Sequence, residues 1–407
     1  MDCKIEICSA KSEISTDCCI GSLQIPPKVL KFIQNSVKSA KQKRKNMKKF
    51  IAALFSALFL AGLPTALNAA DAQVQEKPTL RKMIAQMIMV SFNGSDPKTA
   101  KEAVSEAKYQ RFGGVMLLGK NISDKKNLKV LTSAFKEAQK GIFIAIDEEG
   151  GQITRFKDKS GFETFISAQK VAKTLDLAAA GELYAKMAQQ LKDVGINVNF
   201  APVADVLNPK STIIGSRGRA FSADIDEVSL YASEFMKASQ ARGVIAAMKH
   251  FPGHGNVEAD SHAAKVVIEN FDYTELKPYF DAIRKNEAKM IMVGHIYLAQ
   301  RDALLPASLS PALIDGLLRG ELKFDGVVIS DDMLMGGLKD FTLQQKVINF
   351  INAGGDVMLF SDYKIDGRRT AELVTQLVVD AVGAKQISKG RIEESYARIM
   401  KLKGSLK

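Results

Sequence analysis

Short runs of apolar residues alternate with longer stretches in which apolar and polar residues recur at helical spacing. The runs are continuously apolar rather than alternating, which is typical of strands that are buried on both faces of a parallel sheet. The pattern therefore predicts eight buried parallel strands. They cover residues 87–92 (MIMVSF), 114–118 (GVMLL), 142–146 (IFIAI), 196–200 (INVNF), 244–248 (VIAAM), 290–293 (MIMV), 326–329 (GVVI) and 356–360 (DVMLF).

Amphipathic segments between the runs predict the helices that connect such strands. A further segment, Ile392–Leu402, follows the last run and would complete the ring of helices. Strand–helix alternation repeated eight times indicates a closed (β/α)8 TIM-type barrel rather than an open sheet. We therefore expect a single barrel domain over residues 73–407. Its connecting helices include Thr99–Tyr109, Lys126–Lys140, Ala178–Val194 and Asp226–Arg242.

Ionisable residues follow the ends of most of these predicted strands. Barrel enzymes build their active sites at the carboxyl ends of the strands. Buried charges must be paired or hydrogen-bonded, so a barrel without a site at this end has no reason to repeat such a pattern. The sequence therefore predicts an active site there. The residues are Asp147-Glu148-Glu149-Gly150-Gly151, Asp205, Lys249-His250, His295 and Asp331-Asp332.

The N-terminal region reads as a targeting segment that begins inside the chain. Residues 47–72 combine two lysines after Met47, an apolar stretch from Phe50 to Leu63 and small residues after Pro64. This layout is typical of a secretory signal peptide, and the stretch is shorter than the roughly 20 residues of a membrane-spanning helix. An uncleaved N-terminal anchor is the alternative.

We expect residues 1–46 to be a non-native extension that arises from a misassigned start site. The mature chain would then be exported, to the periplasm of a bacterium, and would have no stable membrane span after signal cleavage.

Composition excludes several classes of function. The chain is 46% hydrophobic and 25% charged, as in ordinary globular proteins. Its net charge is +12, but the sequence has no run of basic residues beyond residue 72. We therefore expect no nucleic-acid partner. All four cysteines lie in the first twenty residues, so the barrel has no thiol chemistry, disulfide or Cys-ligated metal. We expect no cofactor.

The four histidines all lie between residues 250 and 295. His250 and His254 have the spacing of zinc-binding helices, but Pro252 and Gly253 lie between them and disfavour a helix. No HExxH motif is present, so we expect no metal site. His295 has an alternative interpretation as a buried core histidine.

The chemistry that best fits these residues is acid–base catalysis. Asp260-Ser261-His262 places a carboxylate two residues before an imidazole, and such a carboxylate fixes the tautomer and raises the basicity of the ring. Asp331, at the end of a predicted strand, is a candidate nucleophile. Cleavage of a glycosidic bond with retention needs an acid at the leaving oxygen and a carboxylate at the anomeric carbon.

These residues stand in motifs that resemble a known family. In order and together, the motifs resemble the catalytic barrel of glycoside hydrolase family 3, and within it the β-N-acetylglucosaminidase (β-N-acetylhexosaminidase) branch. The resemblance covers roughly residues 78–404. Its motifs are IDEEGGQITRF (146–156), NFAPVADV (199–206), GSRGRAF (215–221), KHFPGHG followed by DSH (249–262) and VVISDDM (327–333).

The resemblance implies a role for each matching residue. Asp331 would form the glycosyl-enzyme intermediate, His262 would be the general acid/base and Asp260 its partner. Five further residues would bind the sugar hydroxyls: Asp147, Arg155, Arg219, Lys249 and His250. Arg155 is the weakest candidate among them.

Other residues near the motifs have plainer interpretations. By chemistry alone Asp332 could replace Asp331 as the nucleophile. Glu148 and Glu149 could serve packing or start a helix, and Arg217 could be a surface charge.

The implied activity is that of a retaining exo-β-N-acetylglucosaminidase. It would remove terminal amino sugar from peptidoglycan fragments, and we expect the enzyme to be a monomer. Another family 3 activity such as a β-glucosidase is the alternative, although the DSH loop argues against it. A barrel without activity that binds cell wall is a further alternative, and the full set of acid, partner and nucleophile argues against that.

Overall fold

Eight parallel strands close into a barrel in the computed structural model, which describes residues 78–406 except 158, 256 and 258–264. Around the barrel the order is β1, β2, β3, β4, β5, β7, β9 and β10, and β10 pairs with β1 to close the ring. The predicted barrel is therefore confirmed. The strands are β1 Ile88–Val90, β2 Gly114–Leu117, β3 Phe143–Ile146, β4 Val198–Asn199, β5 Ile245–Phe251, β7 Met290–Val293, β9 Val327–Asp332 and β10 Val357–Phe360.

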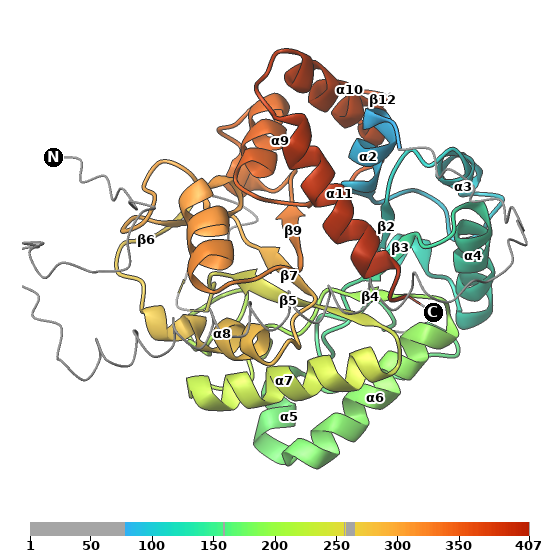
Figure 1. The fold of residues 1–407 in the computed structure, drawn as a ribbon. Coiled ribbons are helices and arrows are strands. Elements are labelled where there is room, and N and C mark those ends of the chain that lie inside the picture. The colour runs from blue at the N-terminus through green and yellow to red at the C-terminus, as the bar shows by residue number, and fades with distance from the viewer. Residues whose placement is uncertain (1–77, 158, 256, 258–264, 407) are drawn as a thin grey trace, which may run out of the picture. The chain divides into compact units, whose positions relative to one another are not determined.

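Helices surround this barrel on its outer side (Figure 1). Between β7 and β9 the connecting helix is a π-helix, and two helices follow β10. The predicted helices are confirmed to within a few residues at each end. The helices are α2 Leu80–Gln86, α3 Lys101–Lys108, α4 Lys125–Ala138, α5 Ala168–Thr174, α6 Leu177–Asp193, α7 Ile225–Ala241, α8 Lys277–Arg284, η4 Ala312–Glu321, α9 Leu343–Asn352, α10 Thr370–Gly383 and α11 Lys389–Lys403.

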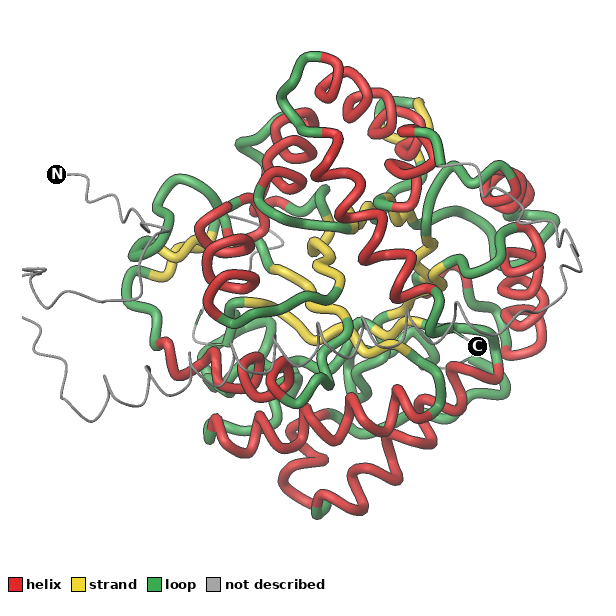
Figure 2. Tube along the Cα trace, in the orientation of Figure 1, coloured by secondary structure: helices red, strands yellow, loops and turns green. Residues whose placement is uncertain are grey.

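Smaller elements sit in the connections, where Figure 2 shows much of the chain as loop. Two small sheets lie outside the barrel: β6 (Val266–Ile268) pairs with β8 (Ile296–Leu298) in parallel, and β11 (Lys364–Ile365) pairs with β12 (Arg368–Arg369) antiparallel. The short 3-10 turns are η1 Gly119–Asn121, η2 Tyr273–Leu276, η3 Ala307–Leu309 and η5 Gly336–Leu338.

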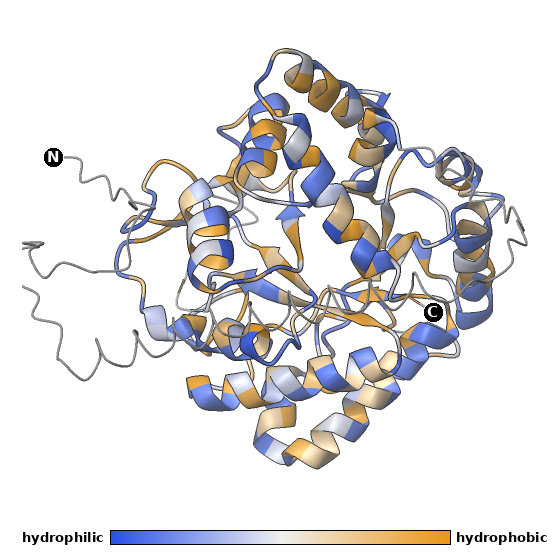
Figure 3. Cartoon of the chain, in the orientation of Figure 1, coloured by the Kyte–Doolittle hydropathy of each residue, from blue (hydrophilic) through white to orange (hydrophobic). Residues whose placement is uncertain are grey.

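Side chains fix where several helices begin. At α4 the carboxylate of Asp124 accepts the backbone N–H of Asn127 at 2.8 Å, which satisfies one of the free N–H groups of the first turn. At α9 the Thr342 hydroxyl accepts the N–H of Gln345, whose side chain accepts the N–H of Thr342 in return. Along the helices, hydrophilic and hydrophobic positions alternate in patches, as Figure 3 shows, so each helix can turn one apolar side to the sheet.

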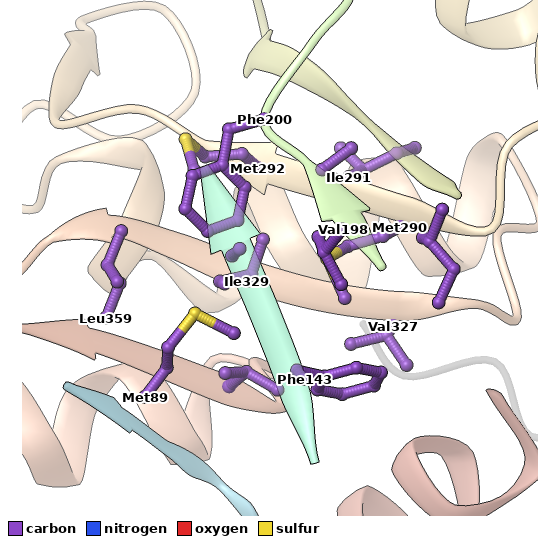
Figure 4. Packing of buried hydrophobic residues seen from close by; sticks show 14 of the residues in the cluster. Met89, Phe143, Val198, Phe200, Met290, Ile291, Met292, Val327, Ile329 and Leu359 are labelled. Carbon is purple, nitrogen blue, oxygen red and sulfur yellow. The ribbon is translucent and has the colours of Figure 1, made fainter. Parts of the chain in front are cut away.

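The barrel interior is a packed core, not a pore. Figure 4 shows side chains from facing strands that fill it, among them Met89, Phe143, Val198, Met290 and Ile329. All of these are fully or almost fully buried. Close packing fixes the strand ends and therefore the side chains that they carry.

Two strands extend further than the apolar runs predict. β5 continues over Lys249 and His250, and β9 includes Asp331 and Asp332. The pairing register shifts at both places, between Met248 and Phe251 in β5 and opposite the end of β9 in β10. Charged residues therefore belong to the strands themselves, because their side chains find polar partners inside the barrel mouth.

Some predictions lie outside the described residues: the extension 1–46, the signal peptide 47–72, Asp260 and His262. Among the described residues, no helix has both the length and the apolar character needed to cross a membrane.

Candidate active site at the carboxyl ends of the strands

A cavity of about 330 Å³ opens at the carboxyl ends of the strands. Its walls contain every described residue for which the sequence predicts a role in catalysis or sugar binding: Asp147, Arg155, Arg219, Lys249, His250 and Asp331. Apolar side chains from several strands line it as well, so the cavity combines many charged and polar groups with an apolar surface. These apolar residues are Met116, Leu118, Ile153, Phe200, Met292, Met335 and Leu359.

A glycine turn brings the loop after β3 back over this cavity. Gly150 and Gly151 have φ of +83° and +61°, a region that side chains disfavour. A Cβ on Gly150 would clash with the carbonyl oxygen of Ile166, so no other residue fits. The turn is closed by the N–H of Glu149, which donates to the carbonyl of Ile153 at 2.9 Å. Asp147 and Glu149 are thereby held at the cavity wall.

Five charged side chains form one continuous ionic network on this wall. The ammonium of Lys249 lies 2.9 Å from Asp147 Oδ1 and 2.7 Å from Glu149 Oε1. Arg219 binds Glu149 through two hydrogen bonds, each 2.8 Å long, and Arg155 Nη2 donates to Asp147 Oδ2 at 2.8 Å. Bidentate, charge-assisted bonds of this kind hold both partners in one geometry.

The network keeps its carboxylates ionised despite their burial. Burial alone would raise the pKa of Glu149, but Arg219 and Lys249 lower it to about 2. The pKa of Asp147 is also lowered, because Lys249 and Arg155 outweigh the effect of burial. Conversely, burial would lower the pKa of Lys249, but Asp147 and Glu149 raise it. The wall therefore presents fixed charges to a bound sugar around neutral pH.

His250 is oriented by a third buried carboxylate, that of Asp205. Its Nδ1 lies 2.7 Å from Asp205 Oδ2, and its Nε2 lies 3.4 Å from Arg219 Nη2. A guanidinium can only donate, so this arrangement fits the tautomer with hydrogen on Nδ1. Asp205 also accepts the backbone N–H of His254 at 2.8 Å, which ties the segment after β5 to the loop after β4.

Asp331 and Asp332 both line the cavity but have different surroundings. Asp332 Oδ1 accepts the backbone N–H of Leu334 at 3.1 Å and of Ser361 at 3.0 Å. Burial raises the pKa of Asp332 despite these bonds. The Asp332 carboxyl thus holds the ends of β9 and β10 together. Asp331 Oδ1 accepts the N–H of Asp332 at 2.8 Å.

The remaining described histidines do not line the cavity. His295 is fully buried: its Nε2 lies 2.9 Å from the carbonyl of Asp332 and its Nδ1 lies 2.7 Å from Ser308 Oγ. Because a carbonyl only accepts, Nε2 carries the hydrogen and Nδ1 accepts the hydroxyl. Burial lowers the pKa of His295. Its interpretation as a satisfied core histidine fits this geometry. Over the described ranges, no three Asp, Glu, His or Cys side chains converge as a metal ion requires.

Glu148 turns away from the cavity, although its two neighbours face it. The side chain is fully buried, and its Oε2 accepts the hydroxyl of Thr154 at 2.6 Å and the N–H of Arg155 at 3.3 Å. Oε1 has no hydrogen-bond partner among the described residues. Burial raises the pKa of Glu148 to about 7. Glu148 therefore holds the loop that carries Arg155.

Glu148→Gln should make folding stability less sensitive to pH. The raised pKa means that the folded state binds the Glu148 proton more tightly than the unfolded state does, so stability is full below about pH 4.5 and falls as pH rises through 7. This loss amounts to roughly 3 kcal/mol. Glutamine keeps the acceptor oxygen and cannot ionise. Denaturant titrations at pH 5 and pH 8 measure the free energy of unfolding. Relative to the wild type, Glu148→Gln should be more stable at pH 8 than at pH 5, whereas the exposed control Glu137→Gln should show no such change. If the unfolding free energies of both variants changed with pH in the same way as that of the wild type, the prediction would be contradicted.

Sequence reasoning missed three contributors to this site. Glu149, for which the sequence suggests only packing or a helix start, is central to the ionic network. Arg217, for which it suggests a surface charge, lines the cavity. For Asp205 the sequence indicates only an ionisable group at a strand end. The signal for Glu149 was its place two residues after Asp147, because residues two apart on an extended chain share a face.

Comparisons with known proteins find relatives of this barrel. Residues 79–402 match the family model described as Glycosyl hydrolase family 3 N terminal domain. Beta-hexosaminidase A of Pseudoalteromonas piscicida is 30% identical over 388 residues, which are 84% of this chain and 63% of that protein.

Solved structures show the same likeness. A family 3 beta-N-acetylglucosaminidase of a Paenibacillus species has a TM-score of 0.74 and 29% identity over 81% of this chain and 62% of its own. The beta-N-acetylhexosaminidase of Beutenbergia cavernae has a TM-score of 0.72 and 27% identity over 80% of this chain and 99% of its own. The chain thus spans less than two-thirds of the first two of these three relatives and almost all of the third.

Proposed function

Because the chain belongs to glycosyl hydrolase family 3, we propose that it is a retaining exo-β-N-acetylglucosaminidase. The observation that carries the proposal is that Asp331 lines the same cavity as the ionic network of Asp147, Lys249 and Arg219. Of the three proteins described above, one is named as a beta-hexosaminidase, one as a beta-N-acetylhexosaminidase and one as a beta-N-acetylglucosaminidase, which supports the proposal. A cavity of about 330 Å³ is at the small end of ligand sites, which suits one terminal sugar and therefore exo cleavage.

Asp331 is the proposed nucleophile. Its carboxylate would attack the anomeric carbon as the glycosidic bond breaks, and water would later release the sugar with retention. The role of Asp332 in holding backbone N–H groups supports Asp331 over its neighbour. Fixed donors on the wall, Lys249, Arg155 and Arg219, would bind sugar hydroxyls without reorganising.

His262 is the proposed general acid/base, with Asp260 as its partner. The leaving sugar of a cell-wall fragment carries negative charge, and so does the nucleophile. An imidazole adds no further negative charge to such a site, whereas a carboxylate would. This is why we propose peptidoglycan fragments as the natural substrates. The signal-peptide pattern of residues 47–72 supports export to the periplasm, and we propose a monomer.

A panel of aryl glycosides tests the activity. The wild-type protein should cleave the N-acetyl-β-glucosaminide and release the sugar with retained configuration, as followed by NMR of the first product. Rapid cleavage of the β-glucoside without the N-acetyl-β-glucosaminide would favour a β-glucosidase. If calorimetry showed that the protein binds muropeptides but no glycoside were hydrolysed, the result would favour a barrel that binds cell wall without activity.

His262→Ala should impair poor leaving groups more than good ones. General acid catalysis contributes about a hundredfold or more when the leaving oxygen needs a proton, and little when it does not. The hydrolysis of a disaccharide should therefore slow by about this factor, whereas that of a dinitrophenyl glycoside should change little. Steady-state kinetics of both substrates measure the difference. An equal loss on the two would remove the acid role from His262.

A further inference from the structure

Arg217 is the one cation of the cavity wall that no protein carboxylate engages within the described residues. The other three, Arg155, Arg219 and Lys249, are each bound to Asp147 or Glu149 at 2.7–2.9 Å. Arg217 lines the same cavity, and its side chain is solvent-exposed. Over the ranges that the structure describes, it makes no hydrogen bond or ion pair. Its charge is therefore available to a ligand.

The backbone that presents Arg217 is fixed on both sides. The N–H of Gly218 donates to the carbonyl of Gly215 at 3.0 Å, and the N–H of Arg219 donates to that of Ile214 at 3.1 Å. Gly218 has φ of +64°, and its carbonyl accepts the N–H of Gln169 at 3.1 Å. Ile214 is fully buried, and Arg219 is anchored to Glu149. Arg217 thus stands at the tip of a rigid turn.

The position of Arg217 determines which part of a bound substrate its side chain can contact. The buried network of Asp147, Glu149 and Lys249 lies deeper in the wall than this exposed side chain. In an exo-acting enzyme the terminal sugar occupies the deep part and the leaving group extends towards solvent. A guanidinium binds carboxylates through two parallel hydrogen bonds.

We propose that Arg217 is a specificity residue that binds a carboxylate on the leaving sugar. The inference rests on the proposed exo-β-N-acetylglucosaminidase activity and deepens it, because it names the feature of the leaving group that the enzyme selects. Arg217 acts on binding and not on the chemical step, so it affects KM more than kcat.

The test compares two substrates that differ only in this charge. One is N-acetylglucosaminyl-β-1,4-N-acetylmuramic acid, and the other is its lactyl methyl ester. Arg217→Gln should lower kcat/KM for the acid by about fivefold, the size expected for a partly exposed ion pair, and for the ester by less than about twofold. Arg217→Lys should retain part of the preference. Added salt should narrow the gap in kcat/KM between the two substrates in the wild type but not in Arg217→Gln.

Arg111→Gln is the matched control, because Arg111 is also exposed and lies outside the cavity. This substitution should change kcat/KM for neither the acid nor the ester. Equal losses on acid and ester in Arg217→Gln would overturn the specificity role while leaving the proposed activity intact. If the wild type cleaved neither disaccharide nor an aryl N-acetyl-β-glucosaminide, the proposed function would fall, and this inference with it.

Discussion

Asp331→Asn is expected to leave a folded protein whose turnover is at least about a thousandfold below that of the wild type, the scale of loss when a covalent nucleophile is removed. The asparagine oxygen can still accept the N–H of Asp332, a bond of 2.8 Å in the wild type, so the end of β9 should keep its geometry. The amide is a far weaker nucleophile than the carboxylate, so no glycosyl-enzyme intermediate should accumulate.

Three measurements follow this change. Stopped-flow kinetics with an activated aryl glycoside should show a burst in the wild type and none in Asp331→Asn. Mass spectrometry after reaction with a fluorinated sugar should place the covalent adduct on the wild-type peptide that contains Asp331. Azide should rescue Asp331→Ala, because a small anion can enter the space of the lost carboxylate, and the product should be the α-glycosyl azide.

Asp332→Asn separates the two adjacent carboxyls. Asp332 holds the N–H groups of Leu334 and Ser361 through one oxygen, which an asparagine oxygen can replace, so Asp332→Asn should keep the fold and leave a burst. A normal burst in Asp331→Asn together with none in Asp332→Asn would assign the nucleophile to Asp332.

The strand order could be predicted because the apolar runs are local signals. Each barrel strand is buried on both faces, so a run such as residues 290–293 marks its strand without reference to any partner. The end of β9 shows where this signal stops. Successive side chains on a regular strand point to opposite faces, yet Asp331 and Asp332 both line the cavity. The register shift between β9 and β10 causes this, and nothing in the local sequence marks it.

The members of the site could be predicted, but not their pairing. Barrel topology alone places Asp147, Lys249 and Asp331 at one end, because each lies at the carboxyl end of a strand. The partner of each charge depends on tertiary geometry: Lys249 meets Asp147 across 102 residues and Arg219 meets Glu149 across 70. Two carboxylates and several cations permit many pairings, and only the packed barrel selects one. The roles of Asp260 and His262 stay predictions.

The largest combined loss of stability and activity is expected for Lys249→Met. Methionine fills a similar volume but carries no charge, so Asp147 and Glu149 each lose a cation while remaining buried. Removing one partner of a buried ion pair costs about 3–5 kcal/mol when the other charge is left uncompensated. Because Asp147 keeps Arg155 and Glu149 keeps Arg219, we expect the loss of stability to lie at the lower end of this range. The same change removes a donor that would bind the sugar, so kcat/KM should fall by at least about a hundredfold.

Lys403→Met provides a matched control from the same barrel. Lys403 is also buried, but it lies near the amino ends of the strands and donates to Gln86 Oε1 at 2.7 Å and the carbonyl of Gly113 at 2.6 Å. Burial lowers its pKa to about 7, and no carboxylate raises it. Removing it should cost these hydrogen bonds and the contact of its ammonium with the Phe143 ring, about 1–3 kcal/mol, and leave kcat/KM unchanged.

The pH dependence distinguishes an ionic cost from a packing cost in Lys249→Met. In the wild type the pKa of Glu149 is lowered to about 2, and that of Asp147 is also lowered. Both carboxylates therefore stabilise the fold at pH values above their pKa in the unfolded chain, and this stabilisation is lost as pH falls towards their pKa in the folded protein. The stability gap between wild type and Lys249→Met should therefore be widest at pH 7 and should narrow towards pH 3. Chemical denaturation at these two pH values measures it. A gap that stayed constant, or one no larger than that of Lys403→Met at pH 7, would mean that Lys249 acts by packing and that the ionic network does not stabilise the site.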